Sequence, residues 1–420
     1  MKNINEYTKE LYRRIDEKKL KRAKNRKIAV VIGVSAALFI GVMSAVMPAM
    51  IKMSASQVEI SDGVYATLKN DNKDRFIAGK RNYGYSAYDD PSAYRLKYNG
   101  LMAFADGGDI YFSIREDGAI YRLGNDTVEY VQGILPNGIY FGGSYYDGGV
   151  YMPAASEIIC GDVRTNGICR YDLESGETTC IISSKDRTRS VLISGKNMFY
   201  AAFDRESVTI KLCDLETGNI YIIAKINMVK DDDEYSPYDT RICLCSDRLA
   251  VLYCGSVYTV TYSGGVTRIA ENAGAITAEG DRIFVFRSVS RNDSVYTQAV
   301  EVEVTVYDAA SGEMIAGYEN DGYAPAQDIN GFSVYEGCLV GVRDGNVYLV
   351  DPTDGGEKML LEGSFGYVIA ARVGEELLIV GDPGWYVWEN SHDTGKVFLV
   401  SSKETLFTGR LPDGINYYRE

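Results

Sequence analysis

The 420-residue chain is 46% apolar and 24% charged, a balance that is usual for globular proteins and excludes wholesale disorder. A single histidine excludes a multi-histidine metal site, and 33 Tyr and 43 Gly beside 9 Pro favour many strands joined by tight turns over a helical bundle. The formal net charge of −14 disfavours nucleic acid as a partner, because an acidic body repels phosphate.

The chain begins with a basic arm. Residues 1–27 contain eleven Lys or Arg and four Asp or Glu. Apolar residues recur there at spacings of three and four, at Ile4, Tyr7, Leu11 and Ile15. This spacing predicts an amphipathic helix. Such a helix either lies on anionic lipid headgroups or docks a cytoplasmic partner, and the sequence leaves both readings open.

A charge-free segment follows the arm. Residues 28–51 are 24 consecutive residues without Asp, Glu, Lys or Arg, and about 20 apolar residues are enough to cross a bilayer. The excess of basic residues before it places the N-terminus in the cytoplasm and residues 53–420 outside the cell. We therefore expect a single-pass cell-membrane protein that contacts membrane lipid through residues 28–51. The alternative is a signal peptide that is cleaved near residues 54–56.

Residues 53–97 are rich in tyrosine, and we expect them to form a stalk that joins the first repeat of the next region. Within them, residues 63–79 resemble a hairpin found later in the chain, at residues 118–133. This hairpin either pairs with residues 414–419, within the C-terminal closing segment 411–420, as a partial eighth repeat or lies as a closing strand on the last repeat.

A repeated four-strand unit organises residues 98–410. Its last two strands flank a turn of the form D-x-x-(S/T)-G or a shorter one, in which Asp caps the turn and Gly supplies a positive φ. The regular recurrence at about 42 to 50 residues predicts an all-β fold, a seven-bladed β-propeller, with eight blades as the alternative. The predicted blades are residues 100–134, 138–183, 190–226, 239–270, 273–318, 330–362 and 365–410.

The repeats resemble those of known propellers. The segment GDIYFSIREDGAIYRL, residues 108–123, is similar to a TolB-like repeat, and hairpins such as KLCDLETGNIYII, residues 211–223, are similar to those of WD-repeat, YVTN and quinoprotein propellers. The resemblance is architectural and does not identify a function, because turn chemistry is shared by many functions. Together with the apolar segment, it points to a membrane-anchored bacterial propeller. Quinoprotein repeats carry a Trp after the hairpin, and no hairpin here has one, so we expect no quinone and no cofactor.

Eight cysteines follow the apolar segment. Cys169 and Cys180 fall on facing strands of one hairpin, where a disulfide is geometrically possible, and Cys160 can also approach Cys169. The alternative is that most of the cysteines are small buried strand residues. No two pairs have the spacing of zinc ligands, so we expect no metal.

The long connections of the predicted propeller share one end. With the strands of a blade called A to D, the A–B and C–D turns are short, and every long connection is B–C or D–A. Loops on a rigid scaffold concentrate binding residues, and aromatic side chains dominate binding hot spots. We predict that this face binds an extracellular protein or glycan. The candidate residues on it are Tyr235, Tyr238, Tyr296, Tyr323, Trp385, Tyr386, Trp388 and His392.

The sequence has no nucleophile elbow, no H-E-x-x-H and no Walker loop. We therefore expect a binding or scaffolding module, not an enzyme. Two alternatives stay open. One is a transmembrane signalling regulator, similar to bacterial anti-sigma-type regulators, with the propeller as its sensor. The other is a glycan-active enzyme with carboxylates around the central channel.

Overall fold

The fold comes from a computed structural model that describes residues 55–411, apart from residues 62–63, 78–82, 86–100, 107, 115–118, 125–126, 134–142, 154–157, 161–162, 205, 229–239, 289–301, 320–323, 327–331, 367, 382–394 and 402. Residues 1–53 form a unit separate from residues 54–420. The predicted basic arm, the apolar segment and residues 412–420 lie outside the described residues. No helix in the described part is long and apolar enough to span a bilayer.

Seven antiparallel sheets follow one another along the chain, and the strands that form the blade in each sheet occur in chain order. Blades one to three consist of β5 (Leu101–Asp106), β6 (Asp109–Ile114), β7 (Ala119–Leu123) and β8 (Val128–Gly133); β9 (Ser144–Tyr146), β10 (Gly149–Pro153), β12 (Val163–Asp172) and β13 (Thr178–Ser184); and β14 (Arg187–Ser194), β15 (Asn197–Phe203), β16 (Ser207–Asp214) and β17 (Ile220–Asn227).

Blades four to seven have the same strand order, except that two short strands share the inner position of blade six. They consist of β18 (Arg241–Leu244), β19 (Arg248–Tyr253), β20 (Ser256–Thr261) and β21 (Val266–Ala270); β22 (Ala275–Glu279), β23 (Arg282–Ser288), β24 (Val302–Asp308) and β25 (Met314–Glu319); β26 (Ala324–Pro325), β27 (Val334–Tyr335), β28 (Cys338–Arg343), β29 (Asn346–Val350) and β30 (Glu357–Leu361); and β31 (Val368–Val373), β32 (Glu376–Gly381), β33 (Lys396–Val400) and β34 (Thr405–Arg410).

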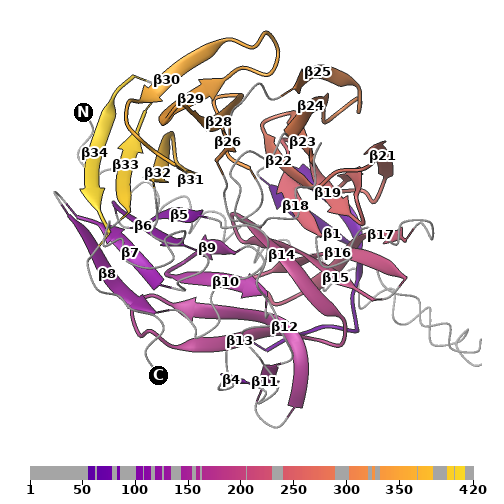
Figure 1. Cartoon of the computed structure of the whole chain (residues 1–420). Coiled ribbons are helices and arrows are strands. Elements are labelled where there is room, and N and C mark those ends of the chain that lie inside the picture. The colour runs from indigo at the N-terminus through magenta and orange to yellow at the C-terminus, as the bar shows by residue number, and fades with distance from the viewer. Residues whose placement is uncertain are drawn as a thin grey trace, which may run out of the picture. The chain divides into compact units, whose positions relative to one another are not determined.

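The blades close into a ring. The inner strand of blade seven, β31, contacts the inner strand of blade one, β5 (Figure 1). Seven clusters of buried apolar side chains lie between the seven pairs of neighbouring blades, and each cluster draws on both blades of its pair. The prediction of a seven-bladed β-propeller is therefore confirmed.

The alternation of side chains along the strands explains this packing. On β15, Phe199 and Ala201 belong to the cluster shared with blade four, whereas Met198 and Tyr200 belong to the cluster shared with blade two. Successive side chains of a strand point to opposite faces of its sheet, and both faces of each blade are covered by neighbours. This is why the second strand of each blade is apolar on both faces.

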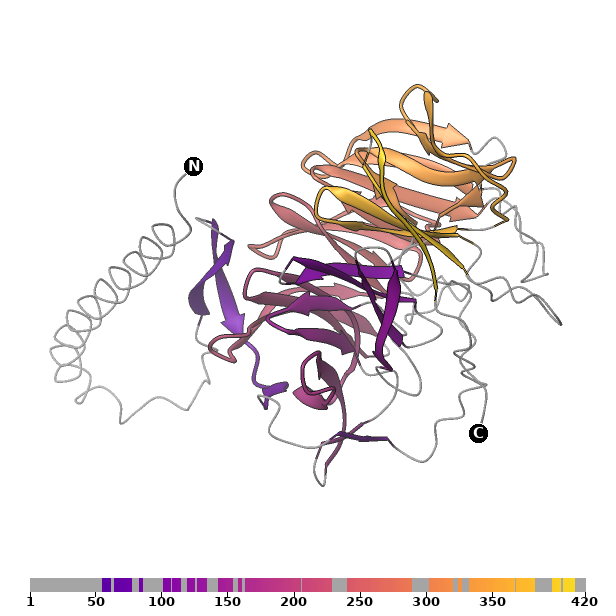
Figure 2. The same cartoon turned by 90° about the vertical axis from the view of Figure 1, so that its left-hand side faces the viewer.

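The region before blade one does not have the predicted arrangement. The strands β1 (Ala55–Ser61) and β2 (Val64–Asn70) form a hairpin that pairs with the outer strand of blade three, and β3 (Arg75–Phe76) pairs with the outer strand of blade two (Figure 2). We call residues 55–77 the strap. The predictions of a stalk, a partial eighth blade and a closing strand on blade seven are wrong for this segment. Its strands instead satisfy backbone groups that an outer edge leaves unpaired.

A second addition lies on blade two. The strands β4 (Tyr83–Tyr85) and β11 (Ile158–Cys160) pair with each other, and β11 also pairs with the start of β12. The B–C connection of blade two, between β10 and β12, is one of the connections that we expected to be long. It is in part an extension of the sheet, because β12 already begins at residue 163.

The C–D turns use the predicted chemistry. In blade two, the Oδ1 atom of Asp172 accepts hydrogen bonds from the backbone N–H and the hydroxyl of Ser175, and Gly176 has a φ of 70°. Blade five repeats this arrangement with Asp308 and Ser311. The Asp side chain thus closes each turn locally, and Gly accepts a φ that other residues rarely adopt.

Candidate functional site

The propeller has two different ends. The A–B connections are tight turns, such as residues 195–196 and 374–375, whereas the B–C connections of blades five and seven separate Ser288 from Val302 and Gly381 from Lys396. Because the strands are antiparallel, B–C and D–A connections leave from the same end. We call this end the loop face and the other end the turn face. The predicted concentration of long connections on one face is confirmed by the strand bounds.

The strap enters on the turn face. Ala55 pairs with Lys69, and the next residue, Asn70, pairs with Tyr221, which follows the C–D turn of blade three. The first described residue of the chain therefore lies toward the turn face. The loop face is at the opposite end of the blades.

The aromatic and histidine residues that we predicted to bind a ligand all belong to connections of the loop face. They are Tyr235, Tyr238, Tyr296, Tyr323, Trp385, Tyr386, Trp388 and His392, and they lie outside the described residues. Their role stays a prediction.

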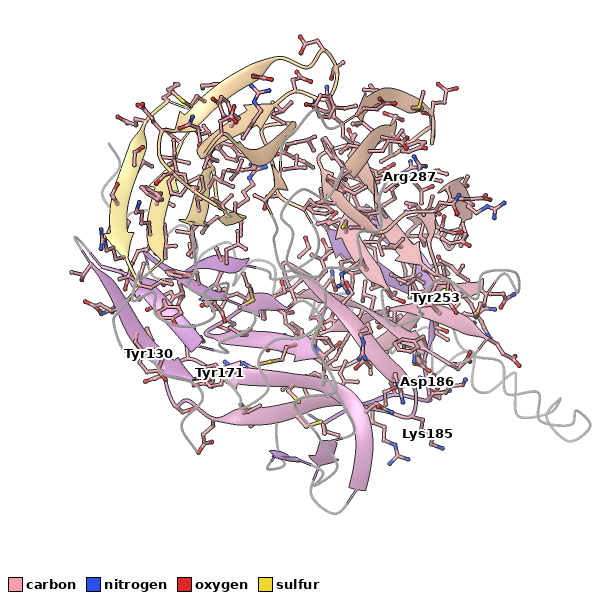
Figure 3. All side chains as sticks on the ribbon, viewed as in Figure 1. Tyr130, Tyr171, Lys185, Asp186, Tyr253 and Arg287 are labelled. Atoms are coloured by element: carbon pink, nitrogen blue, oxygen red, sulfur yellow. The ribbon has the colours of Figure 1, made fainter. Side chains whose placement is uncertain are left out.

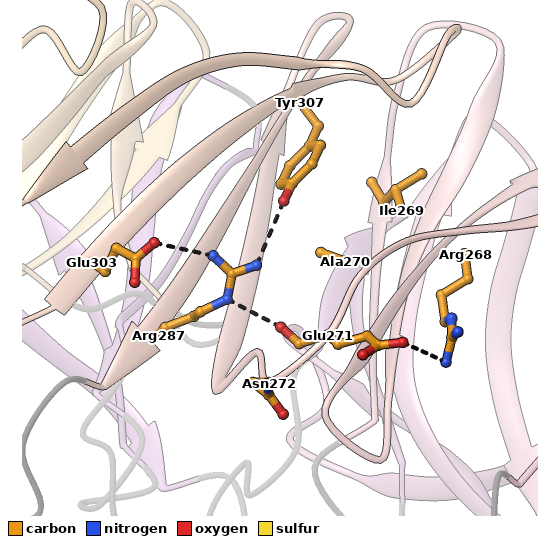
Figure 4. A pocket seen from close by; sticks show the side chains of 8 residues that line it. All are labelled: Arg268, Ile269, Ala270, Glu271, Asn272, Arg287, Glu303 and Tyr307. Carbon is orange, nitrogen blue, oxygen red and sulfur yellow. Dashed lines mark hydrogen bonds and ion pairs between the residues drawn. The ribbon is translucent and has the colours of Figure 1, made fainter.

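A polar hollow borders the loop face between blades four and five (Figure 4). Its volume is about 590 Å³. Blade four contributes β21 and the connection that follows it, and blade five contributes β23 and β24. We call it the interblade hollow. Its lining residues are Arg268, Ile269, Ala270, Glu271, Asn272, Arg287, Glu303 and Tyr307.

Arg287 is the central side chain of the interblade hollow, and Figure 3 labels its position in blade five. Its Nε donates to the backbone oxygen of Glu271 at 3.0 Å, which links the two blades. Its Nη1 donates to Thr305 Oγ1 at 2.9 Å and to Glu303 Oε1 at 3.3 Å. Its Nη2 is 3.5 Å from the hydroxyl of Tyr307, at the long limit for a hydrogen bond. The guanidinium plane is therefore fixed from three sides.

Charge is balanced in the interblade hollow. Arg287 pairs with Glu303, and Arg268 pairs with Glu271 at 2.7 Å. The two carboxylates are 43% and 56% exposed, so they are available to a bound molecule. Ile269 and Tyr307 also line the hollow, and both pack on the apolar cluster between the blades. The arrangement offers hydrogen-bond donors and acceptors in fixed positions, which suits the binding of a polar molecule.

No sequence pattern indicates this hollow. Arg287 and Glu303 were visible as charged residues at the loop-face ends of two apolar strands, RIFVFRS and VEVTVYD. Their pairing across β23 and β24 follows from the hairpin register, in which Arg287 is opposite Glu303. The contribution of blade four requires the docking of two blades, which no local pattern contains.

A second charged cluster is buried beneath the strap. Lys211 Nζ lies 2.7 Å from Asp71 Oδ2 and 2.7 Å from Asp74 Oδ2, and the three side chains are at most 2% exposed. Asp74 also accepts hydrogen bonds from the hydroxyls of Tyr200 and Ser184, at 2.8 and 2.7 Å. We call these five residues the strap cluster. It joins the strap to blades two and three.

The charges of the strap cluster alter its pKa values. Burial alone lowers the pKa of Lys211, but Asp74 and Asp71 outweigh it and raise that pKa above its usual value. Burial and the neighbouring Asp74 carboxylate raise the pKa of Tyr200 well above its usual value. Lys211 therefore stays an ammonium ion and Tyr200 a neutral donor, as the strap cluster requires. The sequence signal was a lysine inside the apolar strand SVTIKLCD.

The predicted disulfide between Cys169 and Cys180 is wrong. The two residues are opposite each other in the register of β12 and β13. Cys169 is nevertheless free and buried, and Cys180 is in a disulfide with another residue. The alternative link from Cys160 to Cys169 is excluded for the same reason. Burial raises the pKa of the Cys169 thiol to about 12, so Cys169 behaves as a small apolar core residue.

No family model and no curated protein matches this chain. Among solved structures, it is similar to the β-propeller domain of the Trilobed protease from Pyrococcus furiosus, with 14% identity and a TM-score of 0.45 over 77% of this chain and 98% of that one. It is also similar to the WD40 domain of Neurospora crassa Pan2, with 11% identity and a TM-score of 0.45 over 83% and 99% of the two chains. A third similarity is to TolB from Acinetobacter baumannii, with 14% identity and a TM-score of 0.34 over 72% and 76%.

The chain is a β-propeller. The sheet pairing and the seven interblade clusters establish this architecture, and the similarities concern architecture alone.

Proposed function

We propose that this protein is a membrane-anchored binding or scaffolding module of the cell surface, which holds an extracellular protein or glycan on its loop face. The observation that carries the proposal is the division of the propeller into two ends. The long connections and the interblade hollow share the loop face, whereas the strap enters on the turn face. Binding residues concentrate on loops that a rigid scaffold positions.

The membrane part of the proposal rests on the sequence. Residues 28–51 lack charge and follow a basic arm, which supports one crossing with the N-terminus in the cytoplasm. In this arrangement membrane lipid contacts residues 28–51, and residues 1–27 contact lipid headgroups or a cytoplasmic partner.

Site-specific photocrosslinking tests the binding face. A photoreactive amino acid replaces Tyr386 on the loop face or, as the control, Ser175 in a C–D turn on the turn face of the full-length protein. We expect covalent adducts with an extracellular molecule from position 386 and none from position 175. Adducts from position 175 alone would place the binding surface on the turn face and refute the proposal.

The contribution of the two tryptophans to binding is tested separately, by measuring formation of the same adduct. We expect Trp385→Ala or Trp388→Ala to weaken binding by about 2 kcal/mol or more, because buried aromatic anchors dominate most interfaces. Thermal melting is the control. If both variants unfold, these residues belong to the core and are not binding residues.

A further inference from the structure

We infer that the interblade hollow is a subsite for a neutral sugar. This inference rests on the proposed function and makes it more specific, because it assigns a chemical class of ligand to one place on the loop face. It depends on the balance of charge in the hollow, on the fixed geometry of Arg287 and on the mixture of donors and acceptors around it.

The balance of charge selects a neutral ligand. The two guanidinium groups of Arg268 and Arg287 are matched by the carboxylates of Glu271 and Glu303. An anion that approached Arg287 would also approach Glu303, 3.3 Å away from its Nη1. A cation would meet the guanidinium groups in the same way. Like charges disfavour both kinds of ligand, whereas an uncharged molecule is not repelled.

The lining groups match the hydroxyls of a sugar. Each hydroxyl both donates and accepts hydrogen bonds, so a sugar needs donors and acceptors side by side. Arg287 Nη2 carries two N–H groups, and its one contact in the described part of the chain is the long one to Tyr307. Glu271 and Glu303 each use Oε1 in their ion pair, which leaves Oε2 without a described partner. Neighbouring donor and acceptor atoms therefore line the same hollow.

The geometry is fixed before a ligand arrives. Arg287 is only 22% exposed and is held by the backbone of Glu271 and by Thr305. A group whose conformation is already restricted loses less entropy on binding. The volume of about 590 Å³ lies within the usual range for small-ligand sites.

A glycan array with the full-length protein tests this inference. The protein is kept in a detergent without a sugar headgroup, because a maltoside would compete for the site. The probes are neutral oligosaccharides of glucose, mannose and N-acetylglucosamine, beside acidic oligosaccharides of galacturonic acid and sialic acid. We expect binding of at least one neutral probe and none of the acidic ones.

Two variants and a matched control locate the binding. Glu303→Gln keeps the shape of the side chain and removes the charge balance, and Arg287→Met removes the fixed donor. Both should weaken binding of the neutral probe by about tenfold or more, because each leaves a polar partner unsatisfied. Arg343→Met is the control, since Arg343 forms a similar ion pair with Glu357 in blade six and does not line the hollow. It should change the affinity less than about twofold.

The outcomes separate this inference from the proposed function. Binding of an acidic probe as strong as that of the neutral probes, binding of no probe, or equal binding by wild type, Glu303→Gln and Arg287→Met would each overturn the sugar subsite. If Arg287→Met does not fold, Glu303→Gln carries the test. If the tryptophan variants lose the photocrosslinked adduct while Glu303→Gln binds the neutral probe as well as the wild type does, the subsite is refuted and the loop-face proposal remains intact.

Discussion

Lys211→Met should release the strap from the propeller. The substitution keeps most of the side-chain volume and removes the ammonium group that lies 2.7 Å from both Asp71 and Asp74. The carboxylates of Asp71 and Asp74 then remain buried without the ammonium group that pairs with them. Removal of one member of a buried ion pair costs about 3–5 kcal/mol, much more than the loss of an exposed pair.

The loss should be local, because the strap lies on the outer edges of blades two and three. Hydrogen exchange measured by mass spectrometry on the full-length protein is the assay. We expect faster exchange in β1, β2 and β3, with little change in blades four to seven. Lys196→Met is the control, since Lys196 is 27% exposed, and its pair with Glu216 and its longer pair with Asp214, at 3.1 and 3.5 Å, should together contribute about 1 kcal/mol.

A compensating variant makes the reasoning refutable. Lys211→Met combined with Asp71→Asn and Asp74→Asn has no buried charge in the strap cluster, so much of the protection should return. Unchanged exchange in β1 to β3 of the single variant would show that the apolar contacts of the hairpin hold the strap without the strap cluster. The raised pKa of Lys211 gives a second check. The stability that Lys211 contributes is fully present below its usual pKa of 10.5 and is lost as the pH rises through its higher pKa in the folded protein.

Three further predictions concern other parts of the chain. The pKa of Asp172 is lowered to about 2, chiefly by the hydrogen bond from the Ser175 N–H, so the stability that Asp172 contributes is lost as the pH falls from 3.8 to about 2. Over this pH range the melting temperature of Asp172→Asn should therefore fall less steeply than that of the wild type. Alkylation after denaturation without reductant should modify Cys169 and spare Cys180; a Cys169–Cys180 peptide would contradict the assignment. A membrane-impermeant thiol reagent should not label Asn5→Cys in intact cells, and labelling there would reverse the proposed orientation.

Much of the propeller was predictable because short segments of the sequence determine its strands and turns. The strands β6 and β23 have the bounds that the apolar runs DIYFSI and RIFVFRS suggest. The Asp172 and Asp308 turns are closed by residues at most three positions away. Alternation with period two then determines which side chains face each neighbouring blade.

The strap and the interblade hollow were not predictable from such patterns. The strap joins the sheet of blade three at two residue pairs, Tyr221 with Asn70 and Ile222 with Lys69, which the hydrogen bond from Asp71 N–H to the Ile220 oxygen extends. Its hairpin has the same turn signals as any other in the chain, so the sequence does not specify which edge it covers. Lys211 was a clue, because a lysine in a buried strand needs a partner, but it does not identify Asp71 and Asp74. The hollow likewise depends on β21 of blade four meeting Arg287 of blade five.

The strap also has a consequence for the order of events during synthesis. Its strands leave the ribosome before the blades, but the residues that hold them come much later: Lys211 and Asp74 are 137 positions apart. At a translation rate of about 5–20 residues per second, β1 and β2 wait for roughly 7–30 s before blade three exists to receive them. During that interval their edges and apolar side chains are unpaired, which is the condition that favours association with other chains. A nascent chain stalled before residue 211 therefore leaves these strands open to misassembly.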